Sequence, residues 1–223
     1  MNKCICQLVV LTLFFVQSFA QVTDTVRIGA IPRPCTWINK PVTYQANSNN
    51  SITVGSGKET DLFVFVDGQY YINSATKLLF PPDSDFIFTA RVKPAFANMY
   101  DGGAILLYSD SSNWASFLFE SNEKGNWGVS SSVVTDRISD GNYYELTSNP
   151  QVWLKVVKSG KIFCFYQSPD GKNWTLTRTF PYLKTATMQL GFYAQSPKGP
   201  GCQVEFSEIS YKAKKFTDFF TGE

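Results

Sequence analysis

The chain has 223 residues and a formal net charge of +2, from 20 lysines and arginines against 18 aspartates and glutamates. It contains no histidine, which excludes Ser-His-Asp and Cys-His catalysis and any zinc site with an imidazole ligand. The balanced charge argues against a protein that binds nucleic acid or an anionic membrane surface electrostatically. Aromatic residues make up 16% of the chain, and they can serve either as core or as a surface on which a ligand stacks.

The first twenty residues have the features of a secretory signal peptide. Residues 1–3 form a short basic segment, and Leu8–Val16 is almost wholly apolar. Small residues at positions 18 and 20 form a cleavage site for signal peptidase after Ala20. The apolar run is shorter than the about 20 residues that cross a bilayer, and no later stretch approaches that length. We therefore expect a protein without a membrane span that is secreted, periplasmic or on the cell surface.

The rest of the chain is typical of a succession of short β-strands. β-Branched and aromatic runs recur about every ten residues between clusters of Gly, Pro, Asn and Asp, and no window carries a helical stripe. Alternation is clearest where Phe86 and Phe88 face one side and Ile87 and Thr89 the other. The predicted strands are Ser51–Val54, Asp61–Val66, Ser84–Lys93, Gly103–Ser109, Trp114–Glu120, Trp127–Val134, Val152–Lys158, Lys161–Gln167, Trp174–Thr179, Met188–Ala194 and Cys202–Tyr211.

Residues that favour turns separate several of these strands. Ser159-Gly160 predicts a two-residue hairpin turn, and Asp110–Asn113 and Ser168–Lys172 predict longer hairpin loops. About eleven strands exceed one small immunoglobulin-like sandwich, and no linker divides the chain. We therefore predict an all-β fold, a two-sheet antiparallel jelly-roll sandwich.

An ordered set of motifs extends from Trp37 to Tyr211. It includes Trp37-x-Asn39-x-Pro41, Asp85-Phe86 with Ala90-Arg91-Val92, Tyr100-Asp101-x-Gly103-Ala104-Ile105-Leu106, Asn113-Trp114 with Glu120, Val152-Trp153-Leu154-Lys155 and Ser168-Pro169-Asp170-Gly171. This set resembles a bacterial domain-of-unknown-function family, regulation-of-enolase-like, within the concanavalin A-like lectin/glucanase superfamily. The resemblance implies the same jelly roll, and it leaves the function open because one fold hosts many activities. Two departures, at Gly102-Gly103 and at Ser116, lie where a ligand would bind.

The expected organisation follows from these patterns. Residues 1–20 form the signal peptide, residues 21–36 an N-terminal lead-in, residues 37–211 a single jelly-roll domain, and residues 212–223 a C-terminal tail. Three cysteines follow the signal peptide. Cys164 lies in a strand-like apolar run, and Cys35 and Cys202 could form a disulfide or remain free.

One predicted strand carries a mixed face. In Trp114–Glu120 the alternation places Trp114, Ser116, Leu118 and Glu120 on the same side. An aromatic ring can stack on the C–H face of a sugar while acidic and amide groups bind its hydroxyls, so this face favours a glycan site. The alternative is that Trp114 plugs the sheet edge and Glu120 is solvated or salt-bridged. The candidate ligand-binding residues are Trp37, Asp101, Trp114, Glu120, Tyr166, Gln189 and Tyr193.

The predicted function is non-catalytic glycan binding by a secreted module. One alternative is a glycoside hydrolase or polysaccharide lyase that uses carboxylate or Tyr/Lys chemistry, and another is a protein–protein adaptor of the envelope. Hydrolysis is disfavoured because Glu59-Thr60-Asp61 lacks a third acid on its strand. No catalytic residue and no cofactor are expected. Asp83-Ser84-Asp85 is rich in oxygen ligands, but its spacing is not diagnostic of structural calcium.

Overall fold

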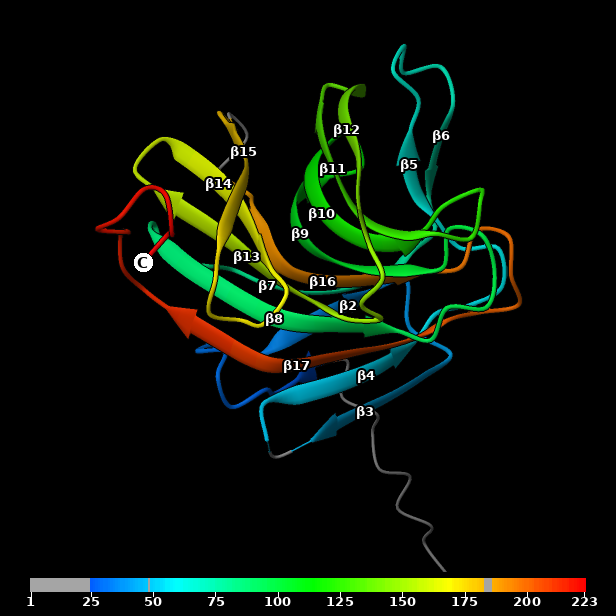
Figure 1. The fold of residues 1–223 in the computed structure, drawn as a ribbon, viewed down its shortest axis with the longest axis horizontal. Helices are drawn as coiled ribbons and strands as arrows, with labels where there is room; N and C mark the ends of the chain where they lie inside the picture. The colour runs from blue at the N-terminus through cyan, green and yellow to red at the C-terminus, as the bar shows by residue number, and fades with distance from the viewer. Residues whose placement is uncertain (1–24, 48, 183–185) are drawn as a thin grey trace, which may run out of the picture.

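The computed structural model describes residues 25–47, 49–182 and 186–223 (Figure 1). Within these residues it has strands and no helix, which confirms the all-β prediction. The predicted signal peptide lies outside the described residues. The strands are β1 (Thr25–Val26), β2 (Cys35–Ile38), β3 (Thr43–Asn47), β4 (Ser51–Gly55), β5 (Leu62–Val64), β6 (Tyr71–Asn73), β7 (Thr76–Phe80), β8 (Phe86–Pro94), β9 (Gly102–Asp110), β10 (Asn113–Ser121), β11 (Trp127–Thr135), β12 (Ile138–Thr147), β13 (Val152–Ser159), β14 (Ile162–Ser168), β15 (Thr175–Phe180), β16 (Gln189–Gln195) and β17 (Gln203–Lys212).

Two antiparallel sheets form a sandwich, as predicted. One has the order β1-β2-β7-β16-β9-β10-β11-β12 and the other β15-β14-β13-β8-β17-β4-β3. The main core lies between them and is built on stacked phenylalanines from opposite sheets. Phe117 stacks on Phe165 with ring centroids 4.7 Å apart, and Phe192 on Phe206 at 4.4 Å. Most phenylalanines on alternating positions are therefore core.

A separate hairpin covers part of the outer face of the eight-stranded sheet. Strands β9 to β12 curve, and the β5–β6 hairpin stands beside their hollow side (Figure 1). Leu62 and Val64 of the hairpin pack against Leu106, Trp114 and other side chains of the sheet, which forms a second apolar cluster. The hairpin and the curved strands together frame the cavity described below.

All eleven predicted strands are present, with bounds that differ mostly by one or two residues. The run Asp61–Val66 is shortened to β5. Six further strands, β1, β2, β3, β6, β7 and β12, were not predicted. Strand β7 is buried on both faces and β12 is largely exposed on both, so neither alternates between apolar and polar residues. Gly160 and Gly171 adopt φ values of +63° and +72° in two of the predicted turns.

The cysteines of the described chain are free thiols. Cys35, Cys164 and Cys202 are all buried and unbridged, so the disulfide that the sequence allowed between Cys35 and Cys202 is not formed. The Cys202 Sγ instead lies 3.7 Å from the carbonyl oxygen of Ala95. Burial raises the pKa of both Cys35 and Cys202 to about 12, so both stay protonated and weakly nucleophilic at neutral pH.

The C-terminal tail packs on the outer face of the seven-stranded sheet, near β13 and β14 (Figure 1). The Tyr166 hydroxyl donates to the carbonyl of Phe219 at 2.7 Å. The buried Lys155 ammonium donates to the carbonyl of Thr221 at 2.9 Å and pairs with the Glu223 carboxylate. These contacts give the fully buried Lys155 ammonium two partners from the tail, of which Glu223 is partly exposed.

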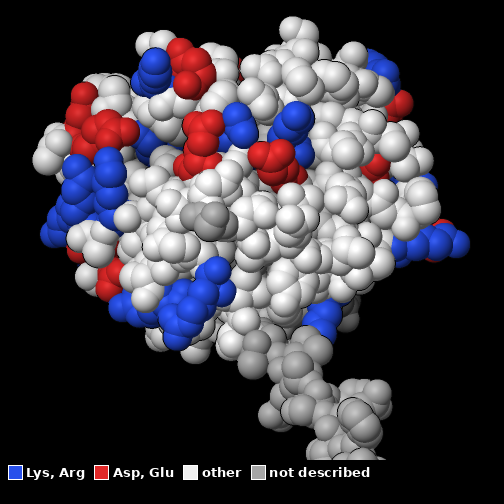
Figure 2. Space-filling view, turned by 90° about the horizontal axis from the view of Figure 1, so that it is seen from below, with Lys and Arg blue, Asp and Glu red and all other residues white. Residues whose placement is uncertain are grey.

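Charge is spread over the surface without a dominant sign. Figure 2 shows basic and acidic side chains interspersed, with wide uncharged areas between them, on the face seen from below. No helix among the described residues has the length and apolar character needed to cross a membrane. The same part of the chain holds no group of three or more His, Cys, Asp or Glu side chains placed to bind a metal ion.

Candidate functional site

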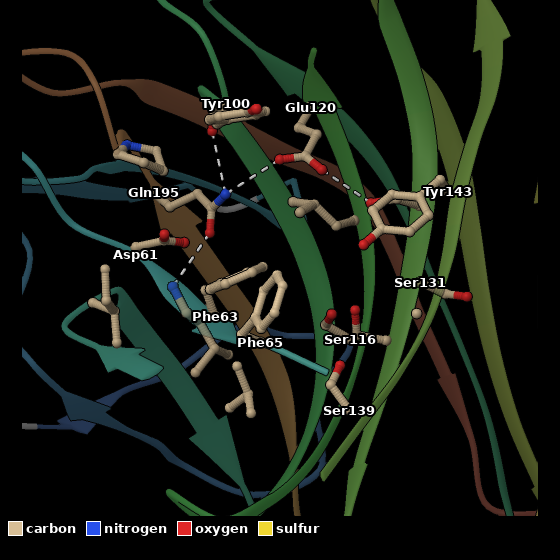
Figure 3. A pocket seen from close by; sticks show the side chains of 18 of the residues that line it. Asp61, Phe63, Phe65, Tyr100, Ser116, Glu120, Ser131, Ser139, Tyr143 and Gln195 are labelled. Carbon is tan, nitrogen blue, oxygen red and sulfur yellow. Dashed lines mark hydrogen bonds between the residues drawn. The ribbon is translucent and has the colours of Figure 1, made fainter. Parts of the chain in front are cut away.

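A cavity of about 580 Å³ lies between the β5–β6 hairpin and strands β10 to β12 (Figure 3). We call it the concave-face cavity. The hairpin contributes an apolar and aromatic wall that includes Phe63, Phe65 and Tyr70, whereas the opposite wall is polar. That polar wall comes from β10, β11 and β12 and consists of Ser116, Ser130, Ser131, Ser132, Ser139, Asn142, Tyr143 and Tyr144.

The hairpin reaches across to the turn between β11 and β12. The Arg137 guanidinium lies over the Tyr71 ring at 4.1 Å from its centroid. Gly68, at the hairpin tip with φ of +73°, approaches so closely that an added Cβ would lie 2.4 Å from the Arg137 carbonyl oxygen. A side chain at this position would clash with that carbonyl oxygen, so the close approach of the hairpin tip to the β11–β12 turn requires glycine.

Strand β10 supplies the floor. Trp114, Ser116, Leu118 and Glu120 all line the cavity, so the alternation in the sequence placed these four side chains on the correct common face. The intervening Phe117 points into the core between the sheets. Strand β10 is buried at every position, because the core covers one face and the β5–β6 hairpin covers the other.

Glu120 is 7% exposed and hydrogen-bonded at the cavity floor. It accepts from Ser130 Oγ at 3.0 Å, from Gln195 Nε2 at 3.4 Å and from the Tyr144 hydroxyl. Desolvation raises the pKa of Glu120 to about 8, and the charge of Asp61 adds to that rise, while the bonds from Ser130 and Tyr144 oppose it. Glu120 is therefore largely a neutral acid at pH 7, able to donate a proton or a hydrogen bond.

Asp61 brings a second carboxyl group to the same cavity from the other wall. Burial raises the pKa of Asp61 to about 6, although the Leu62 backbone N–H and the positive charge of Lys198 lower it. Gln195 links Glu120 to the backbone next to Asp61 (Figure 3): its Nε2 donates to Glu120, and its Oε1 accepts from the Leu62 N–H at 3.4 Å. Two carboxyl groups with separated pKa values thus face one space.

Gln195 also fixes the backbone at the cavity edge. Its Nε2 donates to the Tyr100 carbonyl at 3.2 Å. Tyr100 has φ of +66°, a left-handed conformation that costs a non-glycine residue free energy. The Tyr100 N–H donates to the Ser121 carbonyl at 2.9 Å, so two hydrogen bonds hold this conformation and present the ring to the cavity.

Two buried polar atoms of the cavity lining have no hydrogen-bond partner among the residues that the structure describes. They are Nε1 of Trp114, a residue 2% exposed, and the hydroxyl of Tyr193, a residue 1% exposed. Ser116 lies beside the Tyr193 hydroxyl and opposes the strong rise in its pKa that burial causes, but no hydrogen bond of ordinary geometry joins them. Buried donors are nearly always satisfied in folded proteins, so these two donors are exceptions within the cavity lining.

The structure brings together three of the seven residues predicted to bind a ligand: Trp114, Glu120 and Tyr193. Trp114 differs from the prediction in its environment, because the hairpin covers it and it belongs to the second apolar cluster. Its ring faces are therefore not free to stack on a sugar. Gln189 lies on the same face of β16 as Tyr193 but at the opposite end of the strand from Gln195, outside the cavity lining.

The other three predicted residues have structural surroundings. Trp37 packs against the main core with its ring 5.2 Å from that of Tyr44. Asp101 is fully buried and accepts from the Asn98 N–H at 2.7 Å and from Ser196 Oγ at 2.6 Å, which anchors its loop. Tyr166 lies on the other sheet beneath the C-terminal tail.

The prediction missed Asp61, Tyr100, Tyr144 and Gln195. Asp61 was considered only as part of an acid string along one strand, whereas its partner Glu120 is 59 positions away in the sequence. Tyr144 lies on β12, a strand that was not predicted. The apolar run at the start of the hairpin was a usable signal, because Phe63 and Phe65 alternate with the buried Leu62 and Val64.

Comparison with known proteins assigns the chain to a family. Residues 37–214 match the family described as "Protein of unknown function (DUF1349)". A functionally unknown protein from Saccharomyces cerevisiae is 25% identical, with a TM-score of 0.72 over 81% of this chain and 96% of that chain. A search of curated proteins found no significant match.

Two glycoside hydrolases share the fold at lower identity. The GH43 protein BlXynB from Bacillus licheniformis is 13% identical, with a TM-score of 0.59 over 74% of this chain and 33% of that chain. Xylan beta-1,4-xylosidase from Bacillus halodurans is 11% identical, with a TM-score of 0.59 over 73% of this chain and 33% of that chain. The chain thus spans about a third of those two enzymes, and the likeness concerns the sandwich alone. By its family match, the chain belongs to the DUF1349 family.

Proposed function

We propose that the chain is a secreted jelly-roll module of the concanavalin A-like lectin/glucanase type that binds glycan in the concave-face cavity without cleaving it. The observation that carries the proposal is the pairing of an aromatic wall with a wall of hydroxyl, amide and carboxyl groups. Sugars present apolar C–H faces and polar edges, and a site for them needs both kinds of surface within a few ångströms.

The stacking groups in this proposal are the exposed aromatics at the cavity, not Trp114. Phe65 on the hairpin is 50% exposed and Tyr143 on the opposite wall is 79% exposed. Both line the cavity from facing sides (Figure 3). A sugar ring between them would exchange water for aromatic contact on its C–H face, while the serines beside Glu120 bind its hydroxyls.

A second candidate function is hydrolysis of the bound glycan, and the convergence of Asp61 and Glu120 favours it. Glu120, with its pKa raised to about 8, would protonate the leaving oxygen, and Asp61, with a pKa of about 6, would take a proton from the attacking water. Glycoside hydrolysis of this kind needs no histidine. Gln195 is hydrogen-bonded to Glu120 and to the backbone next to Asp61, and would thereby position the two carboxyl groups relative to each other.

A glycan array with the purified chain, combined with an assay for released reducing ends on the same polysaccharides, tests both candidates. We expect binding without release. Phe65→Ala and Tyr143→Ala should each weaken binding about tenfold, which corresponds to about 1.4 kcal/mol. Phe220→Ala is the matched control, since Phe220 is an exposed aromatic of the C-terminal tail, outside the cavity lining.

The outcomes separate the alternatives. If the wild-type chain releases reducing ends, and the Glu120→Gln and Asp61→Asn variants do not, the non-catalytic proposal is overturned in favour of hydrolysis. If no glycan binds and no reducing ends are released, glycan binding is overturned and the alternative of a protein–protein adaptor is favoured. Equal losses in Phe65→Ala and Phe220→Ala would show that the glycan binds elsewhere on the molecule.

A further inference from the structure

We propose that the concave-face cavity selects glycans that carry a free amino group, and that the ammonium group binds between Glu120 and Asp61. This inference rests on the proposed function and names the class of glycan. It is carried by the charge of the cavity lining, by the placement of the two acids, and by the unpartnered donors next to them.

The lining has more acids than bases. Glu59, Asp61 and Glu120 line the cavity, whereas Lys198 is the single basic residue among its described lining residues. The whole chain carries a net charge of +2, so this local acidic excess is not a reflection of overall composition. A uronic acid would bring a further negative charge to these acids, whereas the ammonium of a cationic sugar would attract them.

The two inner acids enter the cavity from different elements of the fold. Asp61 precedes β5 on the hairpin side, and Glu120 ends the row of β10 side chains on the floor. Their interaction is repulsive, because the charge of Asp61 hinders the ionisation of Glu120. A ligand ammonium placed between them would convert this repulsion into two attractive contacts and would stabilise both carboxylates in the ionised state.

The neighbours of the two acids suit a cation attached to a sugar. Tyr100 and Tyr144 line the same end of the cavity, and aromatic faces attract ammonium groups. The Tyr193 hydroxyl and Trp114 Nε1 are buried donors without partners in the lining. A sugar whose amine reaches the acids would lie against the side chains that carry these donors. The site thus offers complementary groups to both parts of an amino sugar.

Calorimetric titration of the full chain with three matched tetrasaccharides tests this inference. The probes are a glucosamine tetramer, its fully N-acetylated counterpart and a uronic acid tetramer, at pH 7 and 0.15 M salt. We expect the amine form to bind at least tenfold more tightly than the acetylated form, and the uronic acid form to bind least. This order follows because acetylation removes the charge but keeps the sugar ring.

Variants assign the selectivity to named groups. Glu120→Gln and Asp61→Asn should each lower the amine preference to below about threefold, since each replaces a carboxyl group that can ionise beside the ligand ammonium with an amide that cannot. The control is Glu123→Gln, an exposed acid near the cavity but outside its lining. Thermal unfolding shows which variants fold, and either of the two acid variants alone suffices for the test.

Each result bears on one conclusion. Equal or tighter binding of the acetylated tetramer, or an unchanged preference in both acid variants, would overturn this inference and leave glycan binding intact. If other glycans on the array bind and the glucosamine tetramer does not, this inference is also overturned while glycan binding is retained. Failure of every glycan on the array to bind would overturn the proposed function itself.

Discussion

Ionisation of the buried Glu120 should make the fold less stable as pH rises, and Glu120→Gln should remove that effect. Burial raises the pKa of this carboxyl from its ordinary value of 4.5 to about 8 in the folded state. Between these two values the folded state binds more protons at this position than the unfolded state, so stability falls as pH rises through the window. Above pH 8 the full cost of the buried charge is present. A glutamine keeps the shape and some of the hydrogen bonds without that charge.

The size of the effect follows from the two pKa values. Because one pKa unit corresponds to about 1.36 kcal/mol, the wild type should lose on the order of 3 kcal/mol relative to Glu120→Gln between pH 5 and pH 8. At about 2–4 °C per kcal/mol for a chain of this size, the gap between their melting temperatures should widen by roughly 6–12 °C. Asp61, with a pKa raised to about 6, adds a loss of the same sign in both proteins. The difference between them therefore reports the ionisation of Glu120 together with its coupling to the charge of Asp61.

Thermal unfolding of both proteins at pH 5, 6, 7 and 8, followed by circular dichroism, measures this gap. Asp140→Asn is a suitable control, because Asp140 is an exposed acid that pairs with Arg178 and lies outside the cavity lining. Its difference from wild type should change little over the same range. A gap between wild type and Glu120→Gln that stays constant from pH 5 to pH 8, or that narrows, would refute the assignment of Glu120 as a carboxyl kept neutral by burial.

Three further perturbations test the packing around the site and the tail. Trp114→Ala should cost about 3–5 kcal/mol in chemical denaturation, because the indole is enclosed in the second apolar cluster; a near-unchanged midpoint would show that it is free to stack on ligands. Gly191→Ala should cost about 1–3 kcal/mol or prevent folding, since an added Cβ would lie 2.0 Å from the Leu78 carbonyl oxygen; unaltered expression and melting temperature would contradict that close approach. Removing residues 216–223 should cost about 1–3 kcal/mol, because the buried Lys155 loses its carbonyl and carboxylate partners. Lys155→Met in the shortened chain should recover part of this loss, and a double-mutant cycle that shows no recovery would assign the cost to apolar contacts instead.

The fold could be predicted from the sequence where the pattern of a strand reflects a single buried face. Strand β8 alternates between core and outer side chains, and the turn at Gly160 is readable from its residue type. Strand β7 is buried on both sides, once by the core and once by the β5–β6 hairpin, and contains the buried Lys77. Such a strand has no alternation to detect, and only the tertiary structure explains how it tolerates a lysine.

The candidate site was predictable along one strand and not across strands. Alternation correctly placed Trp114 and Glu120 on a common face, because residues two apart in a strand share a side. It could not show that Asp61 meets Glu120, since that contact depends on how a distant hairpin folds over the sheet. The same limit explains Tyr166, which has the right residue type and the right alternation but lies on the other sheet under the C-terminal tail.

The central claim is that glycan binds inside the concave-face cavity, and blocking that cavity tests it most directly. Ser132 lines the cavity and is half-buried on β11, so Ser132→Phe should fill part of the space without entering the main core. Ser159→Phe is the matched control, since Ser159 is also a half-buried strand serine but lies on the seven-stranded sheet. Calorimetric titration with the tightest glycan from the array should show binding lost in Ser132→Phe and retained in Ser159→Phe. Unchanged affinity in a folded Ser132→Phe protein would contradict the cavity as the binding site.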